Sequence, residues 1–351
     1  NKGAFPLVFG VEEAFNNPFV LNQNATTIMK DKSLNSSMSI LYNGTKYQFS
    51  AQTAYQKNYR YYTNPIDGDF SPIDAITVVN NYGKEWNQIS AWTQDLKLNS
   101  IGNQPFKWTI GAYLFSQNAP TKQGTHFGTD AYLMGIERSN FTLINTTKSK
   151  RKGIAFYGQA TYALSEKLNL TAGLRNDFEQ IEQSVNGSLL MDNNKAIYET
   201  QALISRTTDF GALSPKLGLD YNISATQMAF VNYSKGFRAG GLTPLSSDPS
   251  QPPLIRYKPE YSNNIELGLK NTLFNNHARL NLTVFYTRLV DAQVPTLILP
   301  DAITIIQNRG KLNSKGIELE FTAQANAHLS IDYNAGMTNA KFESLEIAQN
   351  G

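Results

Sequence analysis

The 351-residue sequence predicts an all-β chain that crosses a membrane as an antiparallel β-barrel. Three observations lead to this fold class. Apolar and polar side chains alternate with a period of two in one segment after another. The connections between these segments are alternately short and long. Only 17% of the residues are charged, against roughly 25% in an average soluble domain, and no run of 18 apolar residues could form a transmembrane helix.

The alternation defines twelve expected strands. In 168–175, for example, Leu168, Leu170, Ala172 and Leu174 share one side of the strand, because successive side chains point to opposite faces. Each segment therefore has one apolar face and one polar face. The expected strands are 35–42, 45–60, 86–98, 105–116, 153–163, 168–180, 211–221, 226–235, 261–270, 278–290, 313–323 and 328–338.

The connections favour a transmembrane barrel over a soluble β-sandwich, which also alternates. Tight turns at one end of the strands and long loops at the other are typical of outer-membrane barrels, whereas long loops are uncommon in compact soluble domains. With short turns on the periplasmic side, Phe106, Trp108, Tyr162 and Tyr221 fall near one rim, as an aromatic girdle requires. The long connections are 61–85, 117–152, 181–210, 236–260 and 291–312.

The two faces have different expected environments. A barrel of twelve or more strands is wide enough to hold water or a plug, so the polar face lines the interior and the apolar face meets lipid. Residues 1–34 alternate poorly, and we expect an extracellular loop with strand fragments there, followed by the barrel segment over 35–351. Since Asn1 is not an initiator, we expect an interior piece of a longer polypeptide.

Composition excludes several functions. The chain has no cysteine, which excludes a disulfide scaffold, a zinc ribbon and a thiol nucleophile. The net charge is +3 without a concentrated basic stripe, which argues against binding to nucleic acid. The three histidines are scattered, so no spacing suits a metal site or a catalytic triad. We therefore predict no enzyme activity, no metal site and no cofactor.

Six motifs follow one another in a characteristic order and spacing. They are GIAFYGQATY at 153–162, LNLTAGLR at 168–175, VNYSKGFRAGG at 231–241, YKPEYSNNIELGLK at 257–270, NLTVFY at 281–286 and NRGKLNSKGIELE at 308–320. Together they resemble the barrel of TonB-dependent outer-membrane receptors, over roughly residues 35–345, and most closely the branch associated with ferric siderophores.

The resemblance implies a 22-stranded barrel in the bacterial outer membrane, with a plug domain and a TonB box that this sequence does not show. It also implies active import of a ferric siderophore or similar iron chelate. The implied partners are the TonB–ExbB–ExbD inner-membrane complex, reached through the plug, the siderophore, and outer-membrane lipid or lipopolysaccharide. The alternatives are the same receptor class with another cargo, such as a glycan or cobalamin, and a passive porin.

The candidate cargo contacts lie in the outer loops and vestibule. Arg238, in the glycine-rich stretch 236–241, either helps to hold an anionic chelate or pairs with a carboxylate in the interior while the glycines allow a bend. Four tyrosines and one arginine lie close together at the end of one expected strand: Tyr55, Tyr59, Arg60, Tyr61 and Tyr62. They either bind a planar chelate by stacking and cation–π contact or form an outer aromatic girdle with an arginine.

Three further groups complete the candidates. His126 is the only histidine in an outer loop, and we include it among the cargo contacts. Four basic residues precede an inward-running strand and are expected either to bind lipid phosphates or to form a solvated charge run: Lys148, Lys150, Arg151 and Lys152. Glu318 and Glu320 share a strand face, about 7 Å apart, and we assign them to a row of interior charges rather than to a glycosidase pair. That row also contains Lys107, Arg175, Lys216 and Lys270.

Overall fold

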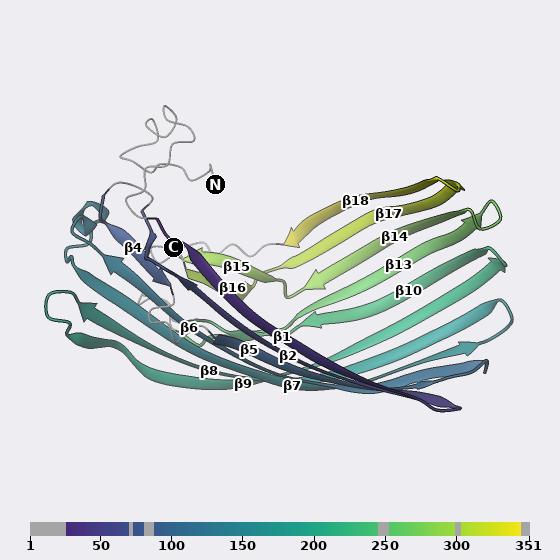
Figure 1. Ribbon diagram of the computed structural model, residues 1–351, viewed down its shortest axis with the longest axis horizontal. Helices are drawn as coiled ribbons and strands as arrows, with labels where there is room; N and C mark the ends of the chain where they lie inside the picture. The colour runs from purple at the N-terminus through teal and green to yellow at the C-terminus, as the bar shows by residue number, and fades with distance from the viewer. Residues whose placement is uncertain (1–25, 70–72, 81–87, 245–252, 299–302, 345–351) are drawn as a thin grey trace.

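The structure is a computed structural model that describes residues 26–69, 73–80, 88–244, 253–298 and 303–344. One antiparallel sheet dominates it and curves into a trough (Figure 1). Among the described residues, no helix reaches the length and apolarity that a membrane span requires. The main path of the sheet contains β1 (Met29–Asn43), β2 (Tyr47–Tyr62), β5 (Gln88–Ser100), β6 (Phe106–Phe127), β7 (Phe141–Ala163), β8 (Leu168–Met191), β9 (Ile197–Ser224), β10 (Gln227–Arg238), β13 (Glu260–Leu273), β14 (Ala278–Val290), β17 (Lys311–Asn326) and β18 (Leu329–Ser344).

These twelve strands are the twelve that the alternation predicts, and each pairs with the next one along the path. Several are longer than expected. Residues 29–34 belong to the region where we expected a loop with strand fragments, and they extend β1; residues 1–25 lie outside the described residues. The expected long connection at 181–210 is mostly strand, because β8 continues to Met191 and β9 begins at Ile197.

The two faces of the sheet differ in chemistry as the alternation requires. We call the face that carries Leu174 and Leu267 the outer face, and the face that carries Arg175 and Lys270 the inner face. Leu174 is 50% exposed and Leu267 is 56% exposed, although both are large apolar side chains. Apolar side chains left open in this number mark a surface that is covered by lipid or by a partner. The dry centre between two sheets that a sandwich requires is absent from these positions.

The short-turn end of the sheet carries the expected aromatic rim. Phe106 lies opposite Tyr162 in the register of β6 and β7, and Tyr221 lies opposite Leu168 between β9 and β8. All three aromatic side chains are on the outer face and exposed, while Trp108 on the same face is partly buried. Aromatic rings at this level are suited to the boundary between hydrocarbon and water.

The long connections contain small elements of their own. They are β3 (Ile66–Asp67), β4 (Ile76–Asn80), the 3₁₀-helix η1 (Ala131–Met134), and two hairpins: β11 (Gly241–Leu242) with β12 (Arg256–Tyr257), and β15 (Gln293–Ile298) with β16 (Ile303–Asn308). Phe127, Ala131 and Phe141 form a buried cluster at the far end of β6 and β7. Their packing explains why these strands continue past the expected end of the membrane.

Candidate functional site on the inner face

The inner face of β8 and β9 becomes apolar towards the long-connection end. Ile181, Val185 and Phe210 are buried there and pack against Leu242 and Leu254, which belong to the segment between β10 and β12. Burying these side chains stabilises the contact by roughly 25 cal/mol per Å² of apolar surface. The β11–β12 hairpin is thereby fixed against the inner wall.

Glycine makes this contact possible. A Cβ atom on Gly240 would collide with the backbone oxygen of Tyr257 and the ring of Phe210, and a Cβ on Gly241 would collide with the ring and hydroxyl of Tyr257. Neither glycine has a positive φ angle. The glycines are thus needed for close approach, which differs from the bend that the sequence analysis considered.

Four arginines lie in or beside the hairpin. Arg151 Nη2 donates to the carbonyl oxygen of Gly240 at 3.3 Å, and Arg206 Nη1 donates to that of Leu254 at 3.1 Å. Arg256 Nη2 donates to the carbonyl oxygen of Asp209 at 3.0 Å, with its guanidinium 4.8 Å from the centre of the Phe210 ring. Arg238, at the end of β10, is exposed.

The side chain of Tyr257 interacts electrostatically with two of these arginines. Burial raises the pKa of the Tyr257 hydroxyl, and the positive charges of Arg151 and Arg238 act in the opposite direction. The side chain is therefore neutral, available as a hydrogen-bond donor, and close to both guanidinium groups. We name the set of Arg151, Arg206, Arg238, Arg256 and Tyr257 the arginine cluster.

The backbone at Arg238 is held by the neighbouring hairpin. Gln293 Nε2 lies 2.9 Å from the carbonyl oxygen of Ala239 and 3.1 Å from that of Lys258. The backbone N–H of Gln293 donates to Glu260 Oε2 at 2.6 Å. Because Gln293 is buried, these bonds fix the start of the segment that follows β10. The cluster can bind an anion, since arginine offers several donors and stacks on aromatic rings.

At the end of β2, the strand register places Tyr59 and Tyr61 on the opposite face of the sheet from Arg60. Tyr55 lies opposite Trp92 on the outer face, and strict alternation places Tyr59 and Tyr61 there too, with their ring centres 5.1 Å apart. Arg60 is on the inner face and forms an ion pair with Asp31 at 2.6 Å, and Tyr62 shares that face. The structure thus does not bring Tyr59 and Tyr61 together with Arg60, and the outer pair fits the aromatic-girdle alternative.

The other candidates lie apart from the arginine cluster. His126 Nε2 is 2.8 Å from Asp192 Oδ2, near the far ends of β6 and β8. Lys148, Lys150 and Lys152 are exposed on the outer face of β7, whereas Arg151 points inward to Gly240. The four basic residues therefore divide between the two faces.

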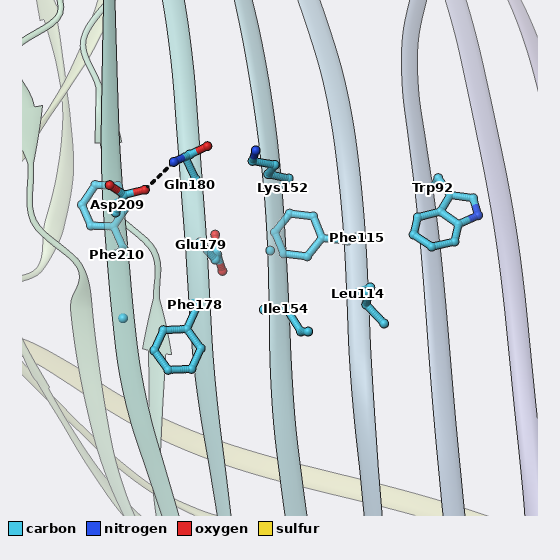
Figure 2. Close-up of a pocket in the computed structure, with 12 residues that line it drawn as sticks. Trp92, Leu114, Phe115, Lys152, Ile154, Phe178, Glu179, Gln180, Asp209 and Phe210 are labelled. Carbon is cyan, nitrogen blue, oxygen red and sulfur yellow. Dashed lines mark hydrogen bonds between the residues drawn. The ribbon is translucent and has the colours of Figure 1, made fainter.

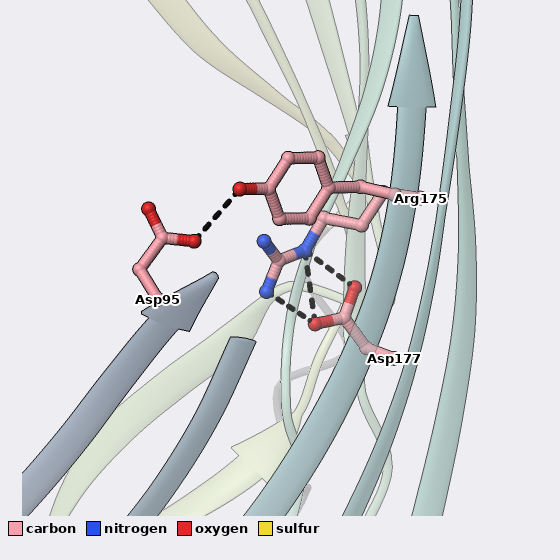
Figure 3. A network of polar contacts seen from close by, with 4 residues as sticks. Asp95, Arg175 and Asp177 are labelled. Carbon is pink, nitrogen blue, oxygen red and sulfur yellow. Dashed lines mark hydrogen bonds and ion pairs between the residues drawn. The ribbon is translucent and has the colours of Figure 1, made fainter. Parts of the chain in front are cut away.

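Two hydrogen-bonded pairs of side chains line the inner face nearer the short turns. Tyr157 Oη donates to Asp95 Oδ1 at 2.7 Å, and Arg175 Nη2 donates to Asp177 Oδ1 at 2.7 Å (Figure 3). Glu318 and Glu320 line a hollow of about 640 Å³ together with Glu266 and Lys270. Within the described ranges, no group of three or more acidic or histidine side chains could hold a metal ion.

Arg206, Arg256 and Tyr257 are functional candidates that were not predicted from the sequence. Arg206 was placed in a long loop that is in fact strand, and the other two lie in a segment whose partner is distant in the sequence. A signal existed in β8: Ile181 and Val185 alternate with Glu182 and Ser184. This alternation predicts a strand whose apolar face points inward, once the strand has left the membrane.

Comparison with known proteins shows which family this chain belongs to. The family model described as "TonB dependent receptor-like, beta-barrel" matches residues 7–349. The chain belongs to the TonB-dependent receptor family. Members of this family are outer-membrane transporters and not enzymes, in agreement with the sequence analysis.

Solved structures of receptors share the fold. The ferric yersiniabactin uptake receptor FyuA from Yersinia pestis superposes with a TM-score of 0.70 at 16% identity, covering 90% of this chain and 44% of FyuA. The ferric-catecholate import receptor Fiu from E. coli K12 gives 0.63 at 11% identity, covering 92% and 49%. The siderophore receptor PiuA from Acinetobacter baumannii gives 0.61 at 13%, covering 90% and 48%. The chain thus spans less than half the length of these receptors.

Proposed function

We propose that this TonB-dependent receptor barrel is part of an outer-membrane importer for a ferric siderophore or a similar anionic iron chelate. The arginine cluster is the observation that carries the proposal. It places several guanidinium groups and the rings of Phe210 and Tyr257 on the inner face, at the end of the strands that bears the long connections. Ferric chelates with catecholate, phenolate or carboxylate groups carry negative charge and planar rings, which such a surface binds.

Arg238 is the residue of the cluster that we assign to the chelate. Its side chain is exposed, while its backbone is held by Gln293. The remaining arginines of the cluster bond to backbone carbonyl oxygens and shape the surface. Arg60 and Tyr62, on the inner face of β2, are a second place where the cargo can make contact, and His126, beside Asp192 at the far end of β6, is a third.

In this proposal the TonB–ExbB–ExbD complex supplies the energy through the plug domain. The receptor itself makes and breaks no covalent bond. Its inner wall binds the chelate and leaves a polar path once the plug moves, along residues such as Lys270, Glu318 and Glu320.

The test uses the full-length receptor in a strain that lacks its own siderophore receptors. Uptake of radioactive iron is measured with ferric catecholate, phenolate and hydroxamate chelates, with and without a functional TonB protein. We expect TonB-dependent uptake of at least one anionic chelate. Uptake that continues without TonB would favour the passive porin, and transport of cobalamin or a glycan instead would favour the other cargo.

Two single substitutions test whether Arg238 contacts the chelate. Arg238→Gln removes a charge-assisted hydrogen bond, which contributes roughly 1.5–3 kcal/mol, so chelate affinity falls about tenfold or more. Lys107→Gln is the matched control, because Lys107 carries the same charge on the inner face but lies next to the short-turn rim. Equal affinities for the two variants would remove Arg238 from the site.

A further inference from the structure

The outer face of β7 changes abruptly from apolar to basic. From Ile154 to Tyr162 its outer-face residues are apolar or glycine, and this stretch of nine residues matches the roughly 9–11 that cross a bilayer. The next outer-face residue is Lys152, followed by Lys150 and Lys148, and all three are exposed. We call these three residues the lysine column. It begins where the hydrocarbon must end, at the long-connection side.

A hollow of about 700 Å³ lies directly below the column. Register gives its floor as two rows of outer-face residues across β5 to β9. The upper row contains Trp92, Ser116, Lys152, Gln180 and Asp209, and the lower row contains Leu114, Ile154, Phe178 and Gly211. Figure 2 shows the apolar side chains of Leu114, Ile154 and Phe178 below Lys152 and Gln180.

Gly211 has a specific part in forming this hollow. It sits beside Phe178 in the lower row, where its missing side chain leaves space. A Cβ atom there would make only an ordinary contact, 3.6 Å from the backbone oxygen of Asp177. The gap is therefore open rather than filled by a neighbour, and it faces the hydrocarbon.

Charge is distributed unevenly around the column. On the β8 and β9 side, Lys150 lies opposite Glu182, and Gln180 Nε2 donates to Asp209 Oδ1 at 2.9 Å. On the β6 side, register places the neutral residues Ser116, Asn118 and Pro120 opposite Lys152, Lys150 and Lys148. An anion is attracted to the β6 side, above Leu114 and beside the indole of Trp92.

We propose that this surface binds one phosphorylated lipid of the outer leaflet. The phosphate contacts Lys150 and Lys152 on their β6 side, and one acyl chain lies in the hollow between Leu114, Ile154, Phe178 and Gly211. An ammonium column directly above an apolar slot at the membrane boundary matches a molecule that has an anionic head and a hydrocarbon tail. Arg151, which the sequence analysis grouped with these lysines, takes no part because it faces inward. The proposal does not depend on the cargo of the receptor.

The experiment titrates the purified full-length receptor, in zwitterionic detergent micelles, with lipid A and counts the bound molecules by native mass spectrometry. We expect one tightly held lipid A in the wild type. Lys150→Gln/Lys152→Gln should weaken its retention at least tenfold. The matched control is Lys30→Gln/Lys32→Gln, which removes two outer-face lysines of β1 away from the hollow and should leave retention unchanged.

Gly211→Leu tests the acyl slot separately. It fills the hollow with an apolar side chain that the lipid-facing surface tolerates, and it should weaken retention of lipid A at least fivefold while all lysines remain. Persistence of the heat-modifiable folded band on a gel shows that each variant has folded. Retention of lipid A by either the lysine variant or Gly211→Leu would overturn the proposal. Complete displacement of lipid A by millimolar inorganic phosphate would also overturn it, because the site would then recognise phosphate alone.

Discussion

Individual residues show how closely the β11–β12 hairpin packs against the inner face of the sheet. Gly240 and Gly241 have no room for a side chain, because Tyr257 and Phe210 lie against them. Arg151 bonds to the backbone oxygen of Gly240, and Arg206 bonds to that of Leu254 in the same hairpin segment. The local geometry of the arginine cluster therefore depends on glycine as much as on charge.

At this scale we predict that Gly241→Ala loosens the segment between β10 and β13. Overpacking of this kind typically costs about 1–3 kcal/mol, and here the cost is expected to be local displacement of the hairpin. Limited proteolysis of the full-length receptor measures it as faster cleavage within residues 239–257. Gly158→Ala is the control, since its Cβ would lie 3.6 Å from the nearest atom, Cγ2 of Ile110; equally fast cleavage in both would contradict the packing argument.

Single strands pass through two environments. Along β8 the outer-face residues Leu170, Leu174 and Phe178 meet lipid, whereas further on Ile181 and Val185 are buried on the inner face. Apolar residues thus change sides where the strand leaves the membrane. The reason is that water covers the outer face beyond the bilayer, and the hairpin covers the inner face.

At the scale of the element we predict that Leu174→Arg is strongly unfavourable. Leu174 lies midway between Leu170 and Phe178, so its side chain is near the bilayer midplane, where arginine costs about 2–4 kcal/mol. Unfolding in urea from lipid vesicles measures this cost. Asn232→Arg is the control, because Asn232 faces inward opposite Glu266 and should change stability by less than about 1 kcal/mol. Similar costs for both variants would contradict the assignment of the faces.

The whole molecule has a direction across the membrane. Short turns lie at one end of the sheet, and the long connections with the arginine cluster lie at the other (Figure 1). Outer-membrane barrels have short periplasmic turns and longer extracellular loops, and we expect the same direction here. The arginine cluster and the lysine column are then both on the cell's outer side, one inside the wall and the other outside it.

Because the 351 residues contain no cysteine, single cysteines can test this direction. We expect Asn193→Cys, in the turn between β8 and β9, to react with a membrane-impermeant maleimide on intact cells. Glu166→Cys, in the turn between β7 and β8, should react only after the outer membrane is permeabilised. Both side chains are exposed, so accessibility within the turn does not decide the result. The reverse pattern would invert the proposed topology.

The strands and their faces follow from the amino-acid sequence alone. Alternation is a local property of an extended backbone, so the twelve strands and the lipid-facing leucines could be predicted without the structure. The same rule, carried past Gly153, already separates Arg151 from Lys150 and Lys152; grouping them by proximity in the sequence lost that information.

The neighbours that each face acquires depend on how the chain folds in three dimensions. Gly240 bonds to Arg151, Leu242 belongs to the same buried cluster as Val185, and Trp92 shares a row with Asp209, across separations that no local pattern encodes. These neighbours follow from strand register and from the folding of a long connection onto the inner wall. Periodicity records which way a side chain points, and contacts between distant segments decide what it meets there.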